Sequence, residues 1–118
     1  MASVSPDRET TVLVTRDGMG RAGPALSHKL LQTFLGLLDL EDSLPGTICF
    51  YTEGVRMVLE NSPVLEELGA LQDRGVKLVI CGTCVNHYGV ADKVRVGEVA
   101  TMKDILAAQW AARKVITL

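Results

Sequence analysis

Short runs of apolar and β-branched residues alternate along the chain with longer segments in which apolar residues recur every three or four positions. Runs of the first kind, bounded by Gly, Pro, Asn or Asp, predict β-strands. Five are expected, at residues 11–15, 47–51, 76–80, 94–96 and 114–118. Because most of them are apolar along their whole length, we expect a parallel sheet that is covered on both faces.

The intervening segments predict helices at residues 24–39, 55–60, 64–74, 85–88 and 101–112. Pro24 suits the first turn of a helix, Ser62 is a candidate N-cap, and Thr101 with Asp104 forms a potential capping box. In the first helix, one apolar face at 3.6-residue spacing is expected to pack on the sheet, with Leu31 and Leu35 beside it. This face consists of Leu26, Leu30, Thr33, Phe34, Leu37 and Leu38.

Strands that alternate with helices indicate an α/β fold, here a three-layer α/β/α domain with a mainly parallel five-stranded sheet. The 118 residues suffice for one domain, which we place at 11–118 after a disordered or extended tail at 1–10. Ligands of such folds bind beyond the carboxyl ends of the strands. We therefore expect the loops 16–23, 52–54 and 81–84 to converge on a binding site.

Composition and charge narrow the classes of function. Of the residues, 47% are apolar and 22% charged, the net charge is −2, and the basic residues are scattered, which argues against a nucleic-acid partner. The chain shows no apolar run long enough for a membrane span and no signal-peptide core near Met1. Three cysteines, an odd number, favour a reducing compartment, so we expect a cytoplasmic protein.

The segment Cys81-Gly82-Thr83-Cys84 carries the clearest chemistry. Cys81 directly follows a predicted buried strand, where the backbone N–H groups of a following helix would stabilise a thiolate. Gly82 and Thr83 are small, which would let the sulfur atom of another molecule approach. Cys84, three residues on, could resolve a persulfide or form a disulfide, and His87 could accept its proton or cap a carbonyl.

Other interpretations of the cysteines are weaker. Cys49 lies in the middle of a predicted strand, where a buried and inert thiol is the ordinary finding. Cys81, Cys84 and His87 have a zinc-like spacing, but a structural zinc site needs four ligands and the chain offers no second pair. We therefore expect neither a metal nor a cofactor.

Asp17 precedes a glycine loop, Gly18-Met19-Gly20-Arg21-Ala22-Gly23, that matches the dinucleotide-binding pattern G-x-G-x-x-G. The acidic residue that this pattern requires about 20 positions on, at the end of the second strand, is not well placed, because the nearest candidate there, Glu53, follows Gly23 by 30 residues. We interpret the glycines as a tight turn that approaches the cysteine loop. Asp17, Gly18, Met19, Gly20 and Glu53 are expected to line the same crevice.

Five segments together resemble the carboxyl-terminal domain of YedF-type proteins, which belong to the DsrE/DsrF-like superfamily and are associated with selenium metabolism. The segments are Asp17–Gly20, Phe50–Val55, Ser62–Glu66, Cys81–Gly89 and Val96–Val99. The resemblance covers about residues 11–118 and implies the DsrEFH-like fold. It also implies sulfur transfer, with a persulfide on Cys81, which precedes Gly89 by eight residues as in sulfur-relay relatives.

The resemblance implies partners as well. These are a protein that donates or accepts sulfur, such as a separate small sulfur-carrier protein, and further copies of the chain in a trimer or hexamer. Two features depart from the family. Only about ten residues precede the first strand, where YedF-type proteins carry a sulfur-carrier domain, and Tyr88-Gly89 replaces the Arg-Gly of relay relatives.

Three functions remain open from the sequence. The leading one is relay of sulfur or selenium by a persulfide carrier, which need not turn over as an enzyme. The second is thiol–disulfide exchange by Cys81 and Cys84. The third is an oligomeric binding or regulatory module whose thiols are inert.

Overall fold

The computed structural model describes residues 6–118 and contains one five-stranded sheet. All neighbouring strands are parallel, in the order β4-β3-β2-β1-β5. The strands are β1 (Thr10–Val14), β2 (Thr47–Phe50), β3 (Lys77–Cys81), β4 (Glu98–Ala100) and β5 (Lys114–Thr117). The parallel sheet expected from the apolar runs is confirmed.

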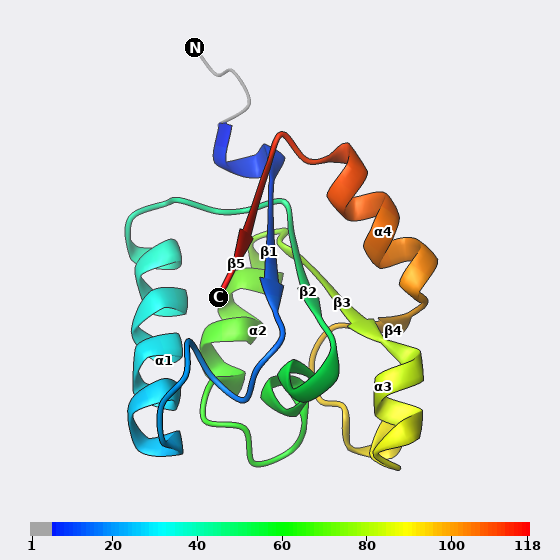
Figure 1. Ribbon diagram of the computed structural model, residues 1–118. Coiled ribbons are helices and arrows are strands. Elements are labelled where there is room, and N and C mark those ends of the chain that lie inside the picture. The colour runs from blue at the N-terminus through cyan, green and yellow to red at the C-terminus, as the bar shows by residue number, and fades with distance from the viewer. Residues whose placement is uncertain (1–5) are drawn as a thin grey trace.

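Helices cover both faces of the sheet (Figure 1). The α-helices are α1 (Pro24–Leu40), α2 (Leu65–Asp73), α3 (Gly82–His87) and α4 (Met102–Ala111). Three 3-10 helices are η1 (Pro6–Glu9), η2 (Thr52–Val58) and η3 (Ala91–Lys93). Helices α1 and α2 pack together on one face and α4 covers the other, which gives the three-layer α/β/α architecture. No helix in the described part of the chain has the length and apolarity to cross a bilayer.

Two hydrophobic cores follow from the alternation of side chains along the strands. Val12, Ile48 and Leu78 point towards α1 and α2 and belong to the larger core. Leu13 and Cys49 point the other way and pack with Ile105 of α4 in a smaller core. The continuous burial of β1, β2 and most of β3 is therefore the result of two cores that share one sheet.

The sequence prediction is wrong at the fourth strand. The fourth strand is Glu98–Ala100, whereas Val94, expected to begin it, forms only an antiparallel bridge to Leu59. Val94 and Val96 are apolar because their loop packs on the larger core. The tail also ends earlier than expected. Its described part, Pro6–Glu9, is η1, and residues 1–5 lie outside the described residues.

The buried face of α1 is rotated from the predicted one. Ser27, Leu31 and Leu35 are fully buried, whereas three leucines of the predicted face are about half exposed. These are Leu26, Leu30 and Leu37. Leucines surround most of this helix, so their spacing does not fix its rotation. The contacts of Ser27 with the loop after β1 fix it instead.

The carboxyl ends of the strands lie at the end of the sheet where η2 and α3 begin (Figure 1). Segment η2 approaches β1 so closely that a Cβ atom at Gly54 would lie 1.9 Å from the carbonyl oxygen of Val14. The N–H of Tyr51 donates to the same oxygen over 3.2 Å. This contact brings the loop after β2 next to the loop after β1.

Candidate functional site

Cys81 and Cys84 lie beside each other at the carboxyl end of β3. Cys81 is the last residue of the strand and the N-cap of α3, and Cys84 lies in the first turn of that helix. Both thiols are free. Cys81 is only 1% exposed and packs in the smaller core, whereas Cys84 is half-buried and contacts both cores. The expected pair is therefore assembled, and its more accessible member is Cys84.

The sulfur of Cys84 accepts a hydrogen bond from the backbone N–H of Thr52, with an N···S distance of 3.1 Å. Burial raises the pKa of the Cys84 thiol, the Thr52 N–H lowers it, and the neighbouring Cys81 thiol raises it again. The balance lies above the ordinary value. At neutral pH Cys84 is thus mainly a thiol, with one donor already aimed at the thiolate that forms on ionisation.

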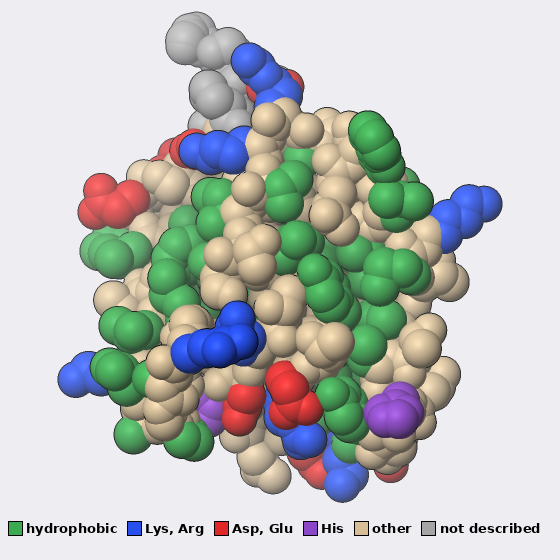
Figure 2. All heavy atoms as spheres, viewed as in Figure 1, with side chains coloured by type: hydrophobic (Ala, Val, Ile, Leu, Met, Phe, Trp, Pro, Cys, Tyr) green, Lys and Arg blue, Asp and Glu red, His purple; other side chains and the backbone are tan. Residues whose placement is uncertain are grey.

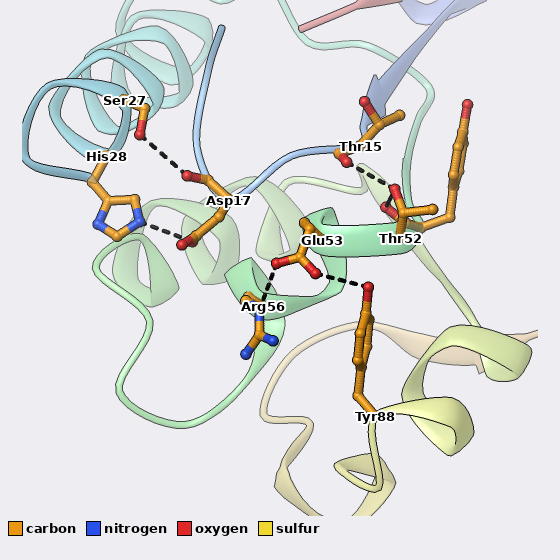
Figure 3. A network of polar contacts seen from close by, with 9 residues as sticks. Thr15, Asp17, Ser27, His28, Thr52, Glu53, Arg56 and Tyr88 are labelled. Carbon is orange, nitrogen blue, oxygen red and sulfur yellow. Dashed lines mark hydrogen bonds and ion pairs between the residues drawn. The ribbon is translucent and has the colours of Figure 1, made fainter. Parts of the chain in front are cut away.

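Thr52 has an unusual backbone conformation, with φ = +50°. A β-branched residue in the left-handed region is a genuine outlier and costs about 1–3 kcal/mol. Its hydroxyl lies 2.8 Å from the carbonyl oxygen of Thr15 and 2.7 Å from that of Tyr51, and donates to them. Because Thr15 follows β1, the hydroxyl ties the loop after β2 to the loop after β1 (Figure 3).

Glu53, the next residue, connects η2 to the end of α3. Its carboxylate accepts hydrogen bonds from the hydroxyl of Tyr88 over 2.8 Å and from Nε of Arg56 over 2.9 Å (Figure 3). The Arg56 guanidinium also lies over the Tyr88 ring, 5.2 Å from its centroid. The Tyr88 hydrogen bond, followed by that of Arg56, lowers the pKa of Glu53. These contacts hold the end of α3 against η2.

The glycine loop is attached to α1. The Asp17 carboxylate lies 2.9 Å from Nε2 of His28, and the Asp17 carbonyl accepts a hydrogen bond from the Ser27 hydroxyl over 3.2 Å (Figure 3). At Gly18, φ is +122° and an added Cβ would lie 2.7 Å from the Ser27 side chain. The predicted tight turn is thus present, but it approaches α1 and not the cysteine loop. Met19 packs against the larger core.

A hollow of about 310 Å³ lies between this loop, the start of α1 and η2. Three of the expected residues line it, namely Asp17, Gly20 and Glu53, whereas Gly18 and Met19 do not. Thr15 also lines it and accepts the hydrogen bond of Thr52. The hollow therefore lies next to the Thr52 segment that contacts Cys84.

The remaining predicted residues have other surroundings. A Cβ at Gly82 would lie 2.9 Å from the carbonyl oxygen of Ala100, so the space beside this glycine is filled by β4. Thr83 is exposed. His87 is exposed too and meets the Tyr88 ring edge-on, with 5.5 Å between centroids, so it makes no hydrogen bond with Cys84. Across residues 6–118, no three His, Cys, Asp or Glu side chains cluster as metal ligands.

Cys49 lies in the smaller core and is fully buried. Burial raises the pKa of its thiol to about 11, which disfavours the nucleophilic thiolate. The structure thus assigns Cys49 to the core, as its position in a predicted strand indicated.

The sequence indicated Thr52 only as part of the loop 52–54, without a role of its own, and did not single out Arg56 as part of this site. Thr52 lies in the segment Phe50–Val55 and Arg56 directly follows it. The resemblance of this segment to the family was the signal that could have pointed to both residues. The left-handed conformation of Thr52 leaves no mark in the sequence, since such positions usually hold Gly, Asn or Asp.

Comparisons with known proteins agree with this arrangement of the chain. Residues 23–118 match the model of the DsrE/DsrF-like family. The chain belongs to this family. No sequence among the curated proteins matches it. The finer likeness to YedF-type proteins stays a prediction.

Solved structures share the fold at low sequence identity. The ychN protein from E. coli has a TM-score of 0.70 and 18% identity, over 92% of this chain and 97% of that one. Protein MTH1491 from Methanobacterium thermoautotrophicum, described as of unknown function, has a TM-score of 0.66 and 18% identity over the same shares. Protein BT1422 from Bacteroides thetaiotaomicron, also described as of unknown function, has a TM-score of 0.68 and 16% identity, over 99% of this chain and 100% of that one. The DsrE-like fold is therefore shared.

Proposed function

We propose that this protein relays sulfur, or selenium in its place, by carrying it as a persulfide on the Cys81–Cys84 pair. The observation that supports this most directly is the contact of two free thiols at the carboxyl end of β3, where α/β sheets bind their ligands. Membership of the DsrE/DsrF-like family and the resemblance to sulfur-relay proteins support it further. The resemblance assigns the persulfide to Cys81.

The transfer needs no external oxidant. A cysteine thiolate attacks the terminal sulfur of a donor persulfide, R–S–SH, so that a new S–S bond forms on the protein and the bond to R–S⁻ breaks. An acceptor thiolate can then take the terminal sulfur in the same way. Alternatively, the second cysteine attacks the sulfur of the first, which forms the Cys81–Cys84 disulfide and releases HS⁻. Each step conserves atoms and electrons.

The donor or acceptor in this proposal is another protein, such as a small sulfur-carrier protein. Cys84 is only half-buried, and Thr83 beside it is exposed, so the Cys84 member of the pair is open to a partner on the side of α3. In this role the chain acts as a carrier. It takes up one sulfur atom from the donor and passes it to the acceptor, and does not itself convert a small-molecule substrate as an enzyme would.

The test is loading with glutathione persulfide, followed by intact-protein mass spectrometry. We expect a reductant-reversible gain of one sulfur atom, about 32 Da, on the wild-type protein and on the matched control Cys49→Ser. The double variant Cys81→Ser/Cys84→Ser should gain nothing. Equal loading of the double variant, or no loading of the wild type, would exclude a persulfide carried on this pair.

We also propose that the protein is a homo-oligomer that buries the outer face of α4. Met102, Leu106 and Trp110 form a stripe at i, i+4 and i+8 and are 49%, 51% and 81% exposed. Val115 of β5 is 42% exposed, and Figure 2 shows hydrophobic side chains gathered on this face. Light scattering should give a multiple of 12.7 kDa for the wild type and a smaller assembly for Trp110→Glu. A monomeric wild type would contradict this.

A further inference from the structure

Cys81 is buried in a core, whereas Cys84 is partly exposed to solvent. This difference in exposure decides which thiol a sulfur donor can reach first. The side chain of Cys81 points into the smaller core, with Cys49 and Ile105, and is 1% exposed. A donor persulfide cannot reach that sulfur atom while the core is closed. Cys84 is half-buried and is the member of the pair with surface towards solvent.

Cys84 also has a specific partner for its negative charge. The N–H of Thr52 donates to its sulfur over 3.1 Å. The residues on either side of Thr52 fix the backbone of this loop through hydrogen bonds of their own. Tyr51 N–H donates to Val14, and Gly54 N–H donates to Tyr51. A backbone donor cannot swing away from the sulfur unless the loop itself changes conformation.

The loop is held in that conformation by the Thr52 side chain. With φ = +50°, Thr52 occupies a region that a β-branched residue avoids, so a compensating contact is required. The hydroxyl supplies it through the carbonyl oxygen of Thr15, 2.8 Å away. The Tyr88–Glu53 hydrogen bond and the close contact of Gly54 with Val14 restrain the two residues that follow Thr52.

We propose that Cys84 is the thiol that first receives the sulfur, and that Thr52 is a positioning residue whose strained backbone aims its N–H at the Cys84 thiolate. This inference rests on the proposed relay and reverses the roles that the resemblance gives to the two cysteines. The Cys84 thiolate attacks the terminal sulfur of R–S–SH and R–S⁻ leaves. Cys81 is then placed to attack the Cys84 sulfur, with formation of the disulfide and release of HS⁻.

The N–H of Thr52 acts on the Cys84 thiolate when the sulfur is taken up, and again on the route in which an acceptor thiolate removes it. It stabilises Cys84 before attack and again when the acceptor takes the sulfur and the thiolate is the leaving group. Burial raises the pKa of the Cys84 thiol, and few other groups solvate the charge of its thiolate. A hydrogen-bond donor therefore stabilises this thiolate more than it would stabilise an exposed one. The Thr52 N–H thus favours the nucleophilic thiolate of a half-buried cysteine without full exposure of its sulfur to solvent.

The test measures the ionisation of Cys84 without any sulfur transfer, so it can fail while the relay itself stands. All variants carry Cys81→Ser, which removes disulfide formation and the influence of the second thiol. The alkylation rate of Cys84 is followed against pH by peptide mass spectrometry. We expect Thr52→Val, which lacks the hydroxyl, to move the midpoint up by about one pH unit, and Thr52→Ser, which keeps it, to match the parent.

A second readout does not depend on substitution of Thr52. In NMR spectra of the parent protein, the Thr52 amide proton should shift with the same midpoint as Cys84, and this titration should vanish in Cys84→Ser. An unchanged midpoint in Thr52→Val together with a Thr52 amide that ignores the ionisation of Cys84 would overturn the proposal. A folded Thr52→Ser variant that behaves as Thr52→Val would also overturn the role of the hydroxyl.

Discussion

The backbone N–H of Thr52 donates a hydrogen bond to the sulfur of Cys84 over 3.1 Å, although the two residues lie 32 positions apart in the chain. This bond joins the loop after β2 to the helix after β3. Parallel strands with their carboxyl ends at one edge make such a meeting possible, because each strand delivers its following loop to that edge. The candidate site is thus assembled from two segments.

The contact between Tyr88 and Glu53 predicts a pH effect. The Tyr88 hydroxyl, followed by Arg56, lowers the pKa of Glu53, so this carboxylate stabilises the fold above its unfolded pKa of about 4.3, and the contribution is lost as the pH falls through the lower folded pKa. In Tyr88→Phe the carboxyl pKa, followed by carbon NMR, should rise towards its ordinary value. The matched control Tyr51→Phe should leave it unchanged. Titration of Glu53 that is the same in Tyr88→Phe and wild type would show that this hydrogen bond is absent in solution.

The buried thiol of Cys49 predicts a loss of stability in alkali. Its pKa is raised to about 11, so above pH 9 the unfolded chain releases this proton while the folded chain keeps it, and stability falls. The shift of about two units corresponds to roughly 2–3 kcal/mol between pH 9 and 11. Urea unfolding of wild type and Cys49→Ala should therefore show a steeper alkaline decline for the wild type. Parallel pH profiles would contradict the burial of this thiol.

Gly54 should tolerate no side chain. In Gly54→Ala the new Cβ would lie 1.9 Å from the carbonyl oxygen of Val14, which must move, so we expect a loss of about 3 kcal/mol or more in the free energy of unfolding. Gly36 is the matched control. It lies inside α1 with no atom within 4 Å of an added Cβ, so Gly36→Ala should stabilise the protein by about 0.5–1 kcal/mol. Equal effects of the two substitutions in urea unfolding would contradict the close contact of η2 with β1.

The sequence predicts the positions of the first three strands well because these strands are mostly apolar and almost entirely buried. It fails at β4, because Glu98–Ala100 is only three residues long and largely exposed. Pairing with β3 defines this strand, and such pairing depends on residues distant in sequence. The apolar Val94 and Val96 belong to a loop that packs on the core, which an apolar pattern cannot distinguish from a strand.

The candidate site is predictable in part for the same reason. Cys81 and Cys84 are recognisable from their position after a buried strand, and the structure places them together. The sequence cannot show that Cys81 points into a core while Cys84 faces the loop after β2, because the turn of α3 decides this. Nor can it predict Thr52, since its conformation depends on contacts with Thr15 and Cys84.

The most direct test of the account compares sulfur loading of Cys81→Ser and Cys84→Ser. Both variants are exposed to glutathione persulfide, and the added sulfur is located by peptide mass spectrometry. We predict that Cys81→Ser gains one reductant-sensitive sulfur on Cys84 and that Cys84→Ser gains none. If Cys84→Ser instead gained the sulfur on Cys81, and Cys81→Ser gained none, the assignment of Cys84 would be contradicted. No loading of either variant or of the wild type would contradict the relay itself.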